Sequence, residues 1–185
     1  MKKLILLFFF LSTTIVHGSV KSKIISNLIL TENLKFKFEQ KIDQKVETGS
    51  CIINYPKKIF CEYDDFNKKV IVSNGKSLLI NSNNNNQYFR YSLDKIPILN
   101  LILDKEFIIN RINELGDSVS TGEYYKFELS YEQLDIIIYF DNQHLNLVGW
   151  STTDIYQNKV ETKLSAVEKN VQVDEKIFDI RNYTN

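Results

Sequence analysis

Few residues of this chain could carry out covalent or metal chemistry. Beyond residue 18 the sequence contains two cysteines, Cys51 and Cys61, and one histidine, His144. A zinc site takes about four ligands at suitable spacing, which these three residues do not supply. Cysteine–histidine nucleophilic catalysis needs a reduced cysteine, a state that oxidising compartments outside the cytoplasm disfavour. We therefore expect no metal, no cofactor and a structural role for His144.

Carboxylates are the remaining candidates for catalysis, and Asp64 and Asp65 form the most obvious pair. They come where an expected strand gives way to a turn, a position at which acidic residues are ordinarily solvated. The sequence also contains no nucleophile elbow of the G-x-S-x-G type. We expect no catalytic residues, and a secreted hydrolase is the weaker alternative.

The two cysteines lie at equal distances along the chain from Pro56, in the turn-favouring segment Tyr55-Pro56-Lys57-Lys58. If a hairpin turns about Pro56, Cys51 and Cys61 lie directly opposite each other and on the same face. Opposite residues have Cβ atoms about 4.5–5.5 Å apart, within reach of a disulfide. We expect a cross-strand disulfide, and two buried free thiols are the alternative.

The elements that must position these residues are mostly short strands. Asn74-Gly75 between apolar runs is a strong hairpin signal, because both residues tolerate the positive φ of a type I′ turn. Together with the turn at Pro56 it predicts an antiparallel meander through residues 49–80. Leu34, Phe36 and Phe38 alternate with lysines, which is typical of a half-buried strand. Further strands are expected at residues 87–93, 123–130, 134–140, 144–153 and 156–166, for a total of roughly ten or eleven.

Helices are expected at two places. Residues 19–31 have apolar side chains at helical spacing. Residues 96–103 form the most apolar run beyond residue 18, and Pro97 suits the first turn of a helix. A helix apolar on nearly all sides must be buried or must cover an apolar surface. Residues 106–115 either extend this helix or begin a strand, and residues 82–86 form a polar loop.

The first residues predict export. Lys2 and Lys3 precede an apolar run at residues 4–11, and Val16-His17-Gly18 offers a cleavage site. A bilayer-spanning helix takes about 20 apolar residues, so this run is too short for a membrane anchor. We expect a signal peptide at residues 1–18 and one domain at residues 19–185; a buried N-terminal helix is the alternative.

The charge balance excludes a basic nucleic-acid-binding surface. The full chain has 23 basic and 23 acidic residues, and removal of Lys2 and Lys3 leaves 21 basic residues. Nucleic-acid-binding domains instead carry a clustered positive face. We expect no nucleic acid among the partners.

Several motifs resemble the periplasmic outer-membrane lipoprotein carrier family, LolA, over about residues 19–180. Ile71-Val72-Ser73-Asn74-Gly75-Lys76-Ser77-Leu78 is the most similar segment. The others, in chain order, are Phe38-Glu39-Gln40, Gly49, Pro56 with Lys58, Glu62-Tyr63 and Pro97-Ile98-Leu99. Each motif is weak alone, but their order and spacing together are fairly specific.

This resemblance implies a mainly β fold with some α structure: an unclosed antiparallel β-barrel, or half-barrel, covered by short helices. It implies a monomeric periplasmic carrier that binds the acyl chains of lipoproteins in a hydrophobic cavity. Cargo would come from an inner-membrane lipoprotein-releasing ABC transporter and pass to an outer-membrane lipoprotein receptor. The residues expected to line the cavity are apolar or aromatic: Phe36, Phe38, Ile53, Tyr55, Ile59, Tyr63, Ile98, Leu99 and Ile102.

Two departures from the family pattern concern the covering helices and the chain end. Family members often carry arginine immediately before the turn proline, where it bonds the covering helices; this chain has Tyr55 there, whose hydroxyl could serve instead. Residues 178–185 lack the usual Pro-Gly ending. Other readings of the same half-barrel are a binding module for another lipid and a stress-sensing domain. A β-domain with a solid core would leave residues 96–103 no cavity to cover.

Overall fold

The computed structural model describes residues 18–66, 68–82, 87–116, 119–120, 122–131, 134–154 and 156–184. Apart from Gly18, the expected signal peptide lies outside the described residues, as do residues 83–86 of the expected polar loop. Within the described ranges, no helix is long and apolar enough to cross a membrane.

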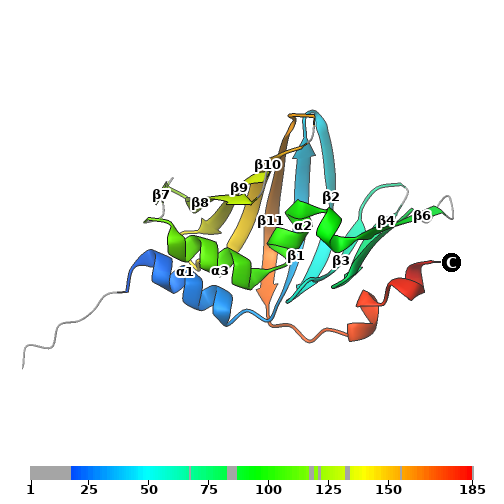
Figure 1. The fold of residues 1–185 in the computed structure, drawn as a ribbon, viewed down its shortest axis with the longest axis horizontal. Coiled ribbons are helices and arrows are strands. Elements are labelled where there is room, and N and C mark those ends of the chain that lie inside the picture. Colours follow the sequence, from blue (N-terminus) through cyan, green and yellow to red (C-terminus); the bar gives the residue numbers. More distant parts are fainter. Residues whose placement is uncertain are drawn as a thin grey trace, which may run out of the picture.

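Most of the chain forms one antiparallel sheet of eleven strands in the order β6-β5-β4-β3-β2-β1-β11-β10-β9-β8-β7 (Figure 1). The strands of the first half are β1 Asn33–Ile42, β2 Lys45–Asn54, β3 Lys58–Tyr63, β4 Lys69–Asn74, β5 Ser77–Ser82 and β6 Gln87–Ser92. Those of the second half are β7 Val119–Ser120, β8 Tyr124–Tyr131, β9 Leu134–Asp141, β10 Leu147–Thr153 and β11 Lys159–Lys169.

Two meanders therefore meet at one long-range pairing, that of β1 with β11, where Phe38 lies opposite Leu164. The sheet ends at β6 and β7, which do not pair with each other, so the barrel stays open. The expected unclosed antiparallel half-barrel is confirmed.

Alternation along the strands gives the sheet one apolar face. On β1, Leu34, Phe36 and Phe38 are buried while Lys35 and Lys37 are exposed. On the neighbouring strands Ile53 and Ile59 continue the buried face, and Ile53 lies opposite both Leu34 and Ile59. We call this the inner face, because the side chains of the helices join it in one hydrophobic cluster.

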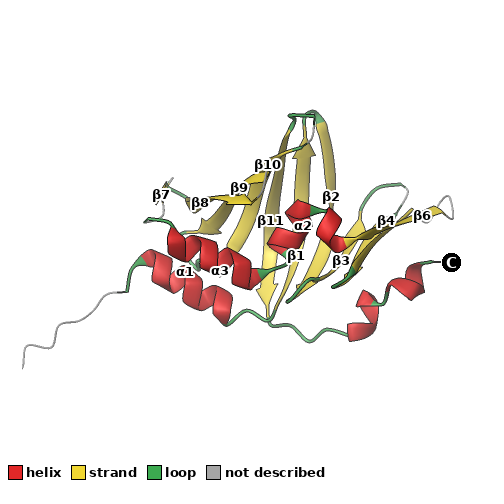
Figure 2. Cartoon of the chain, in the orientation of Figure 1, coloured by secondary structure: helices red, strands yellow, loops and turns green. Residues whose placement is uncertain are grey.

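Helices α1 Val20–Ile29, α2 Pro97–Ile102 and α3 Lys105–Glu114 all lie on the inner side of the sheet (Figure 2). The expected helix at residues 19–31 corresponds to α1, which begins after the Ser19 cap, whose hydroxyl accepts from Ser22 N at 3.2 Å. Of the ambiguous residues 106–115, all but Leu115 are helical, because α3 ends at Glu114. Asp104 caps α3 by accepting from Phe107 N at 3.1 Å, so α3 starts afresh after α2.

The hairpin at Asn74-Gly75 is present, but the expectation that both residues take positive φ is wrong. Only Gly75 does, at +93°. Asn74 ends β4, and its side-chain oxygen accepts from the backbone N–H groups of Lys76 and Ser77 at 3.1 and 3.0 Å. The asparagine therefore supports this turn through its side chain, which is a common role for the residue in turns.

Two further regions complete the fold. The short 3₁₀ helices η2 Glu175–Phe178 and η3 Ile180–Tyr183 carry the end of the chain across the outer face, where Ile180 packs on Val70, Val72 and Leu79. A third, η1 Leu93–Lys95, joins β6 to α2. The strand expected from residue 144 begins at Leu147, because Asp141 folds the preceding residues into a turn by accepting from Asn146 N at 2.8 Å.

Candidate functional site

A cavity of about 1200 Å³ lies between α2 and the inner face of β1 and β9–β11. Its α2 side is apolar and consists of Pro97, Ile98, Leu99 and Ile102. The sheet side contributes Tyr131, Leu134, Trp150, Val160 and Gln40. Acidic and amide groups, among them Asp135, Asp154 and Gln157, stand at its border. The cavity is larger than the range of about 300–1,000 Å³ typical of drug-sized ligand sites.

The sequence explains why α2 can form one wall. Pro97 occupies the first helical position, where its missing N–H costs nothing. Leu101, Ile102 and Leu103 are buried in the core and anchor the helix. Ile98 and Leu99 are only half-buried, so they present apolar surface to the cavity without filling it.

The nine residues expected to line a cavity fall into two groups. Ile98, Leu99 and Ile102 line the open cavity. The other six belong to or pack against the filled hydrophobic core of the inner face: Phe36, Phe38, Ile53 and Ile59 are buried, whereas Tyr55 and Tyr63 are partly buried. All nine residues thus lie on the inner side of the sheet, but six of them belong to the packed core and three line the cavity.

The hydroxyl of Tyr55 does not connect the turn to the covering helices. Its oxygen is buried and has no hydrogen-bond partner among the described residues, and burial raises the pKa of the phenol. The connection is made one residue beyond Pro56. Lys57 N donates to Leu103 O, at the end of α2, at 2.8 Å, and Lys57 Nζ lies 3.7 Å from the Asp104 carboxylate.

Helices α1 and α3 are tied together by another lysine. Lys105 Nζ, in the first turn of α3, donates to Thr31 O at 2.6 Å and to Ile29 O at 3.1 Å, at the end of α1. The ammonium also lies 5.8 Å from the centroid of the Tyr55 ring. The covering helices are therefore attached by a small number of polar contacts at the Lys57–Lys105 end.

Cys51 and Cys61 lie opposite each other on β2 and β3 and form a disulfide, with Cα atoms 4.1 Å apart. Both are buried in the inner-face core. The bridge ties together the two strands that flank the Pro56 turn, next to the attachment of α2.

Tyr63 ends β3 and lies at the periphery of the inner-face core. Its ring packs edge-on against Phe38 at 4.9 Å between centroids, and Lys69 Nζ lies 3.7 Å from its centroid. Burial, together with the negative charges of Glu47 and Asp65, raises the pKa of its hydroxyl. Tyr63 is therefore a neutral structural residue at ordinary pH.

The remaining candidates for chemistry are dispersed. His144 is exposed in the turn before β10, with Nδ1 3.6 Å from the Asp141 carboxylate. Asp64 accepts from the Thr48 hydroxyl, and Asp65 accepts from Lys69 N, as expected of turn residues. Across the described part of the chain, no group of three or more His, Cys, Asp or Glu is placed to hold a metal.

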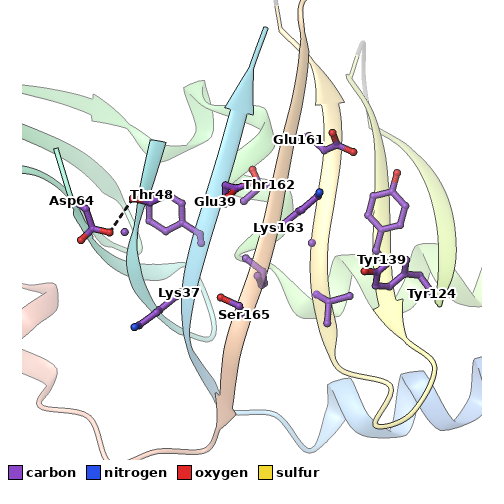
Figure 3. A pocket seen from close by; sticks show the side chains of 15 residues that line it. Lys37, Glu39, Thr48, Asp64, Tyr124, Tyr139, Glu161, Thr162, Lys163 and Ser165 are labelled. Atoms are coloured by element: carbon purple, nitrogen blue, oxygen red, sulfur yellow. Dashed lines mark hydrogen bonds between the residues drawn. The ribbon is translucent and has the colours of Figure 1, made fainter. Parts of the chain in front are cut away.

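The outer face of the sheet carries a second hollow, of about 760 Å³ (Figure 3). Its side chains include Lys37, Glu39 and Lys163, which alternate with the inner residues of β1 and β11, and Tyr139. Gly149 also lines it and allows the close approach of β10 to β11, since a Cβ there would come 2.4 Å from Thr162 O. Charged side chains around it make this hollow a poorer site for an acyl chain than the cavity beneath α2.

The sheet side of the cavity, namely Leu134, Trp150 and Val160, is not among the residues predicted from the sequence. Strands were expected there, but residues 144–150 have apolar side chains on both faces, so alternation did not assign an inner face. The sequence does carry a signal for the inner face of β11, because Val160, Thr162 and Leu164 alternate there with the charged Glu161 and Lys163.

An open antiparallel sheet, covered on its inner face by short helices with an apolar cavity between them, defines a half-barrel binding protein. The chain belongs to the family of the outer membrane lipoprotein carrier protein LolA, whose model matches residues 30–181. Proteins of this family are periplasmic binding or carrier proteins.

Two solved structures share this fold at low identity, and a third is less similar. A conserved uncharacterized protein from Thermus thermophilus is 8% identical with a TM-score of 0.53, covering 85% of this chain and 90% of that chain. MucB is 10% identical with a TM-score of 0.50, and the match covers 86% of this chain and 62% of MucB. A putative outer membrane lipoprotein-sorting protein domain from Vibrio parahaemolyticus is 8% identical with a TM-score of 0.46, covering 88% of this chain and 97% of that chain. No curated protein matches the sequence significantly.

Proposed function

We propose that this protein binds the acyl chains of lipoproteins in the cavity beneath α2 and carries them through the periplasm from the inner to the outer membrane. The observation that carries the proposal is the cavity itself: about 1200 Å³, with Ile98, Leu99 and Ile102 on one side and Trp150 and Leu134 on the other. Membership of the LolA family supports the same assignment.

The energetics of an acyl chain explain why a carrier needs such a cavity. Burial is worth about 0.8 kcal/mol per CH₂, so leaving one long chain in water costs on the order of 10 kcal/mol. The carrier must offset most of this cost, yet release its cargo. A helix that can approach the sheet when the cavity is empty competes with the lipid and keeps binding reversible.

The weakness of the polar attachment of α2 supports such a movement. Its connection to the Pro56 turn depends on one backbone hydrogen bond, from Lys57 N to Leu103 O, and on the partly exposed pair of Lys57 with Asp104. Exposed ion pairs contribute about 0–1 kcal/mol. We propose that Lys57 and Asp104 fulfil the role that arginine before the turn proline has in other family members, and that Tyr55 does not.

Under this proposal the protein receives its cargo from an inner-membrane lipoprotein-releasing ABC transporter and delivers it to an outer-membrane lipoprotein receptor. No bond is made or broken. Depletion of the protein in the bacterium of origin should leave lipoproteins at the inner membrane.

A binding module for another lipid, or a stress-sensing domain, is the alternative, because the same fold can serve different binding functions. Mass spectrometry of material that copurifies with the protein separates the two. Acylated peptides or intact lipoproteins would support the carrier function. A free lipid or glycolipid as the only ligand would overturn it in favour of the alternative.

A further inference from the structure

Strand β6 (Gln87–Ser92) is exposed along its whole length, although three of its six residues are aromatic. Tyr88, Phe89 and Tyr91 are 47%, 57% and 45% exposed. Large aromatic side chains gathered on one exposed strand are typical of an interaction site, because interfaces are enriched in such residues.

The strand is also an edge of the sheet. β5 pairs with one side of β6, and β6 is the last strand in the order, so its other side has no strand partner among the described residues (Figure 1). Such an edge presents backbone N–H and C=O groups that another strand can pair with. A docked strand would satisfy these groups and cover the aromatic side chains together.

The side chains of β6 divide between the two faces in a regular way. Phe89 lies opposite Ile80, whose side chain packs on the inner-face core. Arg90 lies opposite Leu79, which belongs to the outer-face cluster, and its guanidinium donates to the Ser77 hydroxyl at 3.0 Å. Tyr88, two residues from Arg90, shares the outer face with it.

We propose that β6 pairs antiparallel with β6 of a second copy of this chain, about a two-fold axis perpendicular to the sheet that passes midway between the two copies of Phe89. This symmetry keeps the faces of the two sheets continuous. It places Phe89 opposite Phe89 of the second copy, Tyr88 opposite Arg90, and Gln87 opposite Tyr91. The result is an aromatic pair at the centre, with a cation–π pair on each side.

The arrangement of residues favours this register over its two neighbours, because an axis at Tyr88 would lose both Tyr88–Arg90 pairs. Moving the axis by one residue, to Arg90, would place two guanidinium groups directly opposite each other, and like charges in that position are destabilising. The overall charge opposes association little, since the chain beyond residue 18 has 21 basic and 23 acidic residues. The strand is thus complementary to itself, which is what a two-fold interface requires.

A monomer is the expectation from the sequence, and the exposed edge is the feature that argues against it. Five paired residues bury less surface than a permanent dimer needs, so association should be weak and concentration-dependent. Association through β6 does not depend on what the cavity holds and is therefore independent of the proposed function.

Sedimentation equilibrium over a wide concentration range tests the association. The purified protein should approach twice its monomer mass as concentration rises, and Phe89→Asp should weaken association by at least about tenfold, because two carboxylates then oppose each other. Thermal unfolding of Phe89→Asp should match the wild type, since the side chain is exposed. A wild type that stays monomeric at every concentration would overturn the proposal, whether or not its β6 binds an added peptide.

Cysteine cross-linking tests the register. The only two cysteines of the chain are joined to each other, so an introduced thiol is the one free thiol. Under mild oxidation Phe89→Cys should form covalent dimers, because this residue meets its own copy. Arg90→Cys alone should not, but mixing it with Tyr88→Cys should give heterodimers. Tyr156→Cys, exposed elsewhere, measures chance collisions. Efficient dimers of Arg90→Cys alone, or Phe89→Cys dimers no more frequent than those of Tyr156→Cys, would refute this pairing.

Discussion

Replacing Ile98 by aspartate should abolish most acyl-chain binding while leaving the fold intact. Ile98 is half-buried on α2 and faces the cavity, so the empty protein can keep an aspartate there in contact with water. Ile102 is a poorer choice for this test, because it is 2% exposed and anchors α2 in the core.

The size of the effect follows from what a bound acyl chain would do to this side chain. The acyl chain would cover residue 98 and remove water from the carboxylate. Burying an unpaired polar or charged group costs about 1–3 kcal/mol or more. Taking about 3 kcal/mol, with each 1.4 kcal/mol worth a factor of ten, affinity should fall by about a hundredfold. Protonation of the aspartate near pH 4 should restore part of the loss, because a neutral carboxyl costs less to bury.

Titration with a fluorescent fatty acid measures this change. Trp150, the only tryptophan, lines the cavity, so its emission gives an independent signal. Ile98→Leu preserves the apolar surface and should bind normally. Ile25→Asp, on the half-buried part of α1 outside the cavity, controls for a charge on a covering helix. Unchanged affinity of Ile98→Asp, or an equal loss in Ile25→Asp, would show that α2 does not cover the ligand.

Three further predictions concern stability. Replacing Cys51 and its partner by alanine opens a loop with a sequence separation of 10 residues, which should lower the free energy of unfolding by about 2–3 kcal/mol in urea titrations; no change would mean that the bridge contributes nothing. Tyr55→Phe removes a buried hydroxyl that has no hydrogen-bond partner in the described part of the chain, so the melting temperature should stay level or rise, and a clear fall would show that the hydroxyl forms a hydrogen bond. Burial by itself would raise the pKa of Glu47, but hydrogen bonds from Lys45 and Lys69 outweigh it and hold the pKa below 4.5. The stabilisation from Glu47 is therefore present above pH 4.5 and lost as pH falls through the lower folded value, so the deficit of Glu47→Gln should shrink on acidification; a constant deficit would contradict this.

Much of the fold follows from local patterns in the sequence. Alternation around Phe36 and the turn at Pro56 predict strands and register, and the register in turn brings Cys51 and Cys61 together. Asn74-Gly75 correctly marks a hairpin, but not its backbone conformation, because the asparagine can support a turn through its side chain as well as through positive φ. The helical state of residues 105–114 depends on the Asp104 cap, a single side chain within an ambiguous pattern.

Such local patterns do not predict the long-range features of the fold. The pairing of β1 with β11 joins segments more than a hundred residues apart, and no local periodicity specifies it. The same holds for the cavity. The apolar character of residues 96–103 predicts a covering helix, but the hollow exists only where α2 stands over β9–β11. This is why Ile98 could be foreseen as a cavity residue and Trp150 could not.

Site-specific photo-cross-linking in the bacterium of origin tests the central claim most directly. A photoreactive amino acid at Leu99, within the cavity, should capture acylated lipoproteins on irradiation. The same group at Tyr139, in the hollow of the outer face, should not. Lipoprotein adducts from Leu99 alone are the predicted result. Adducts from Tyr139, or none from Leu99 in a protein that is folded and exported, would contradict the assignment of the cavity beneath α2 as the lipid site.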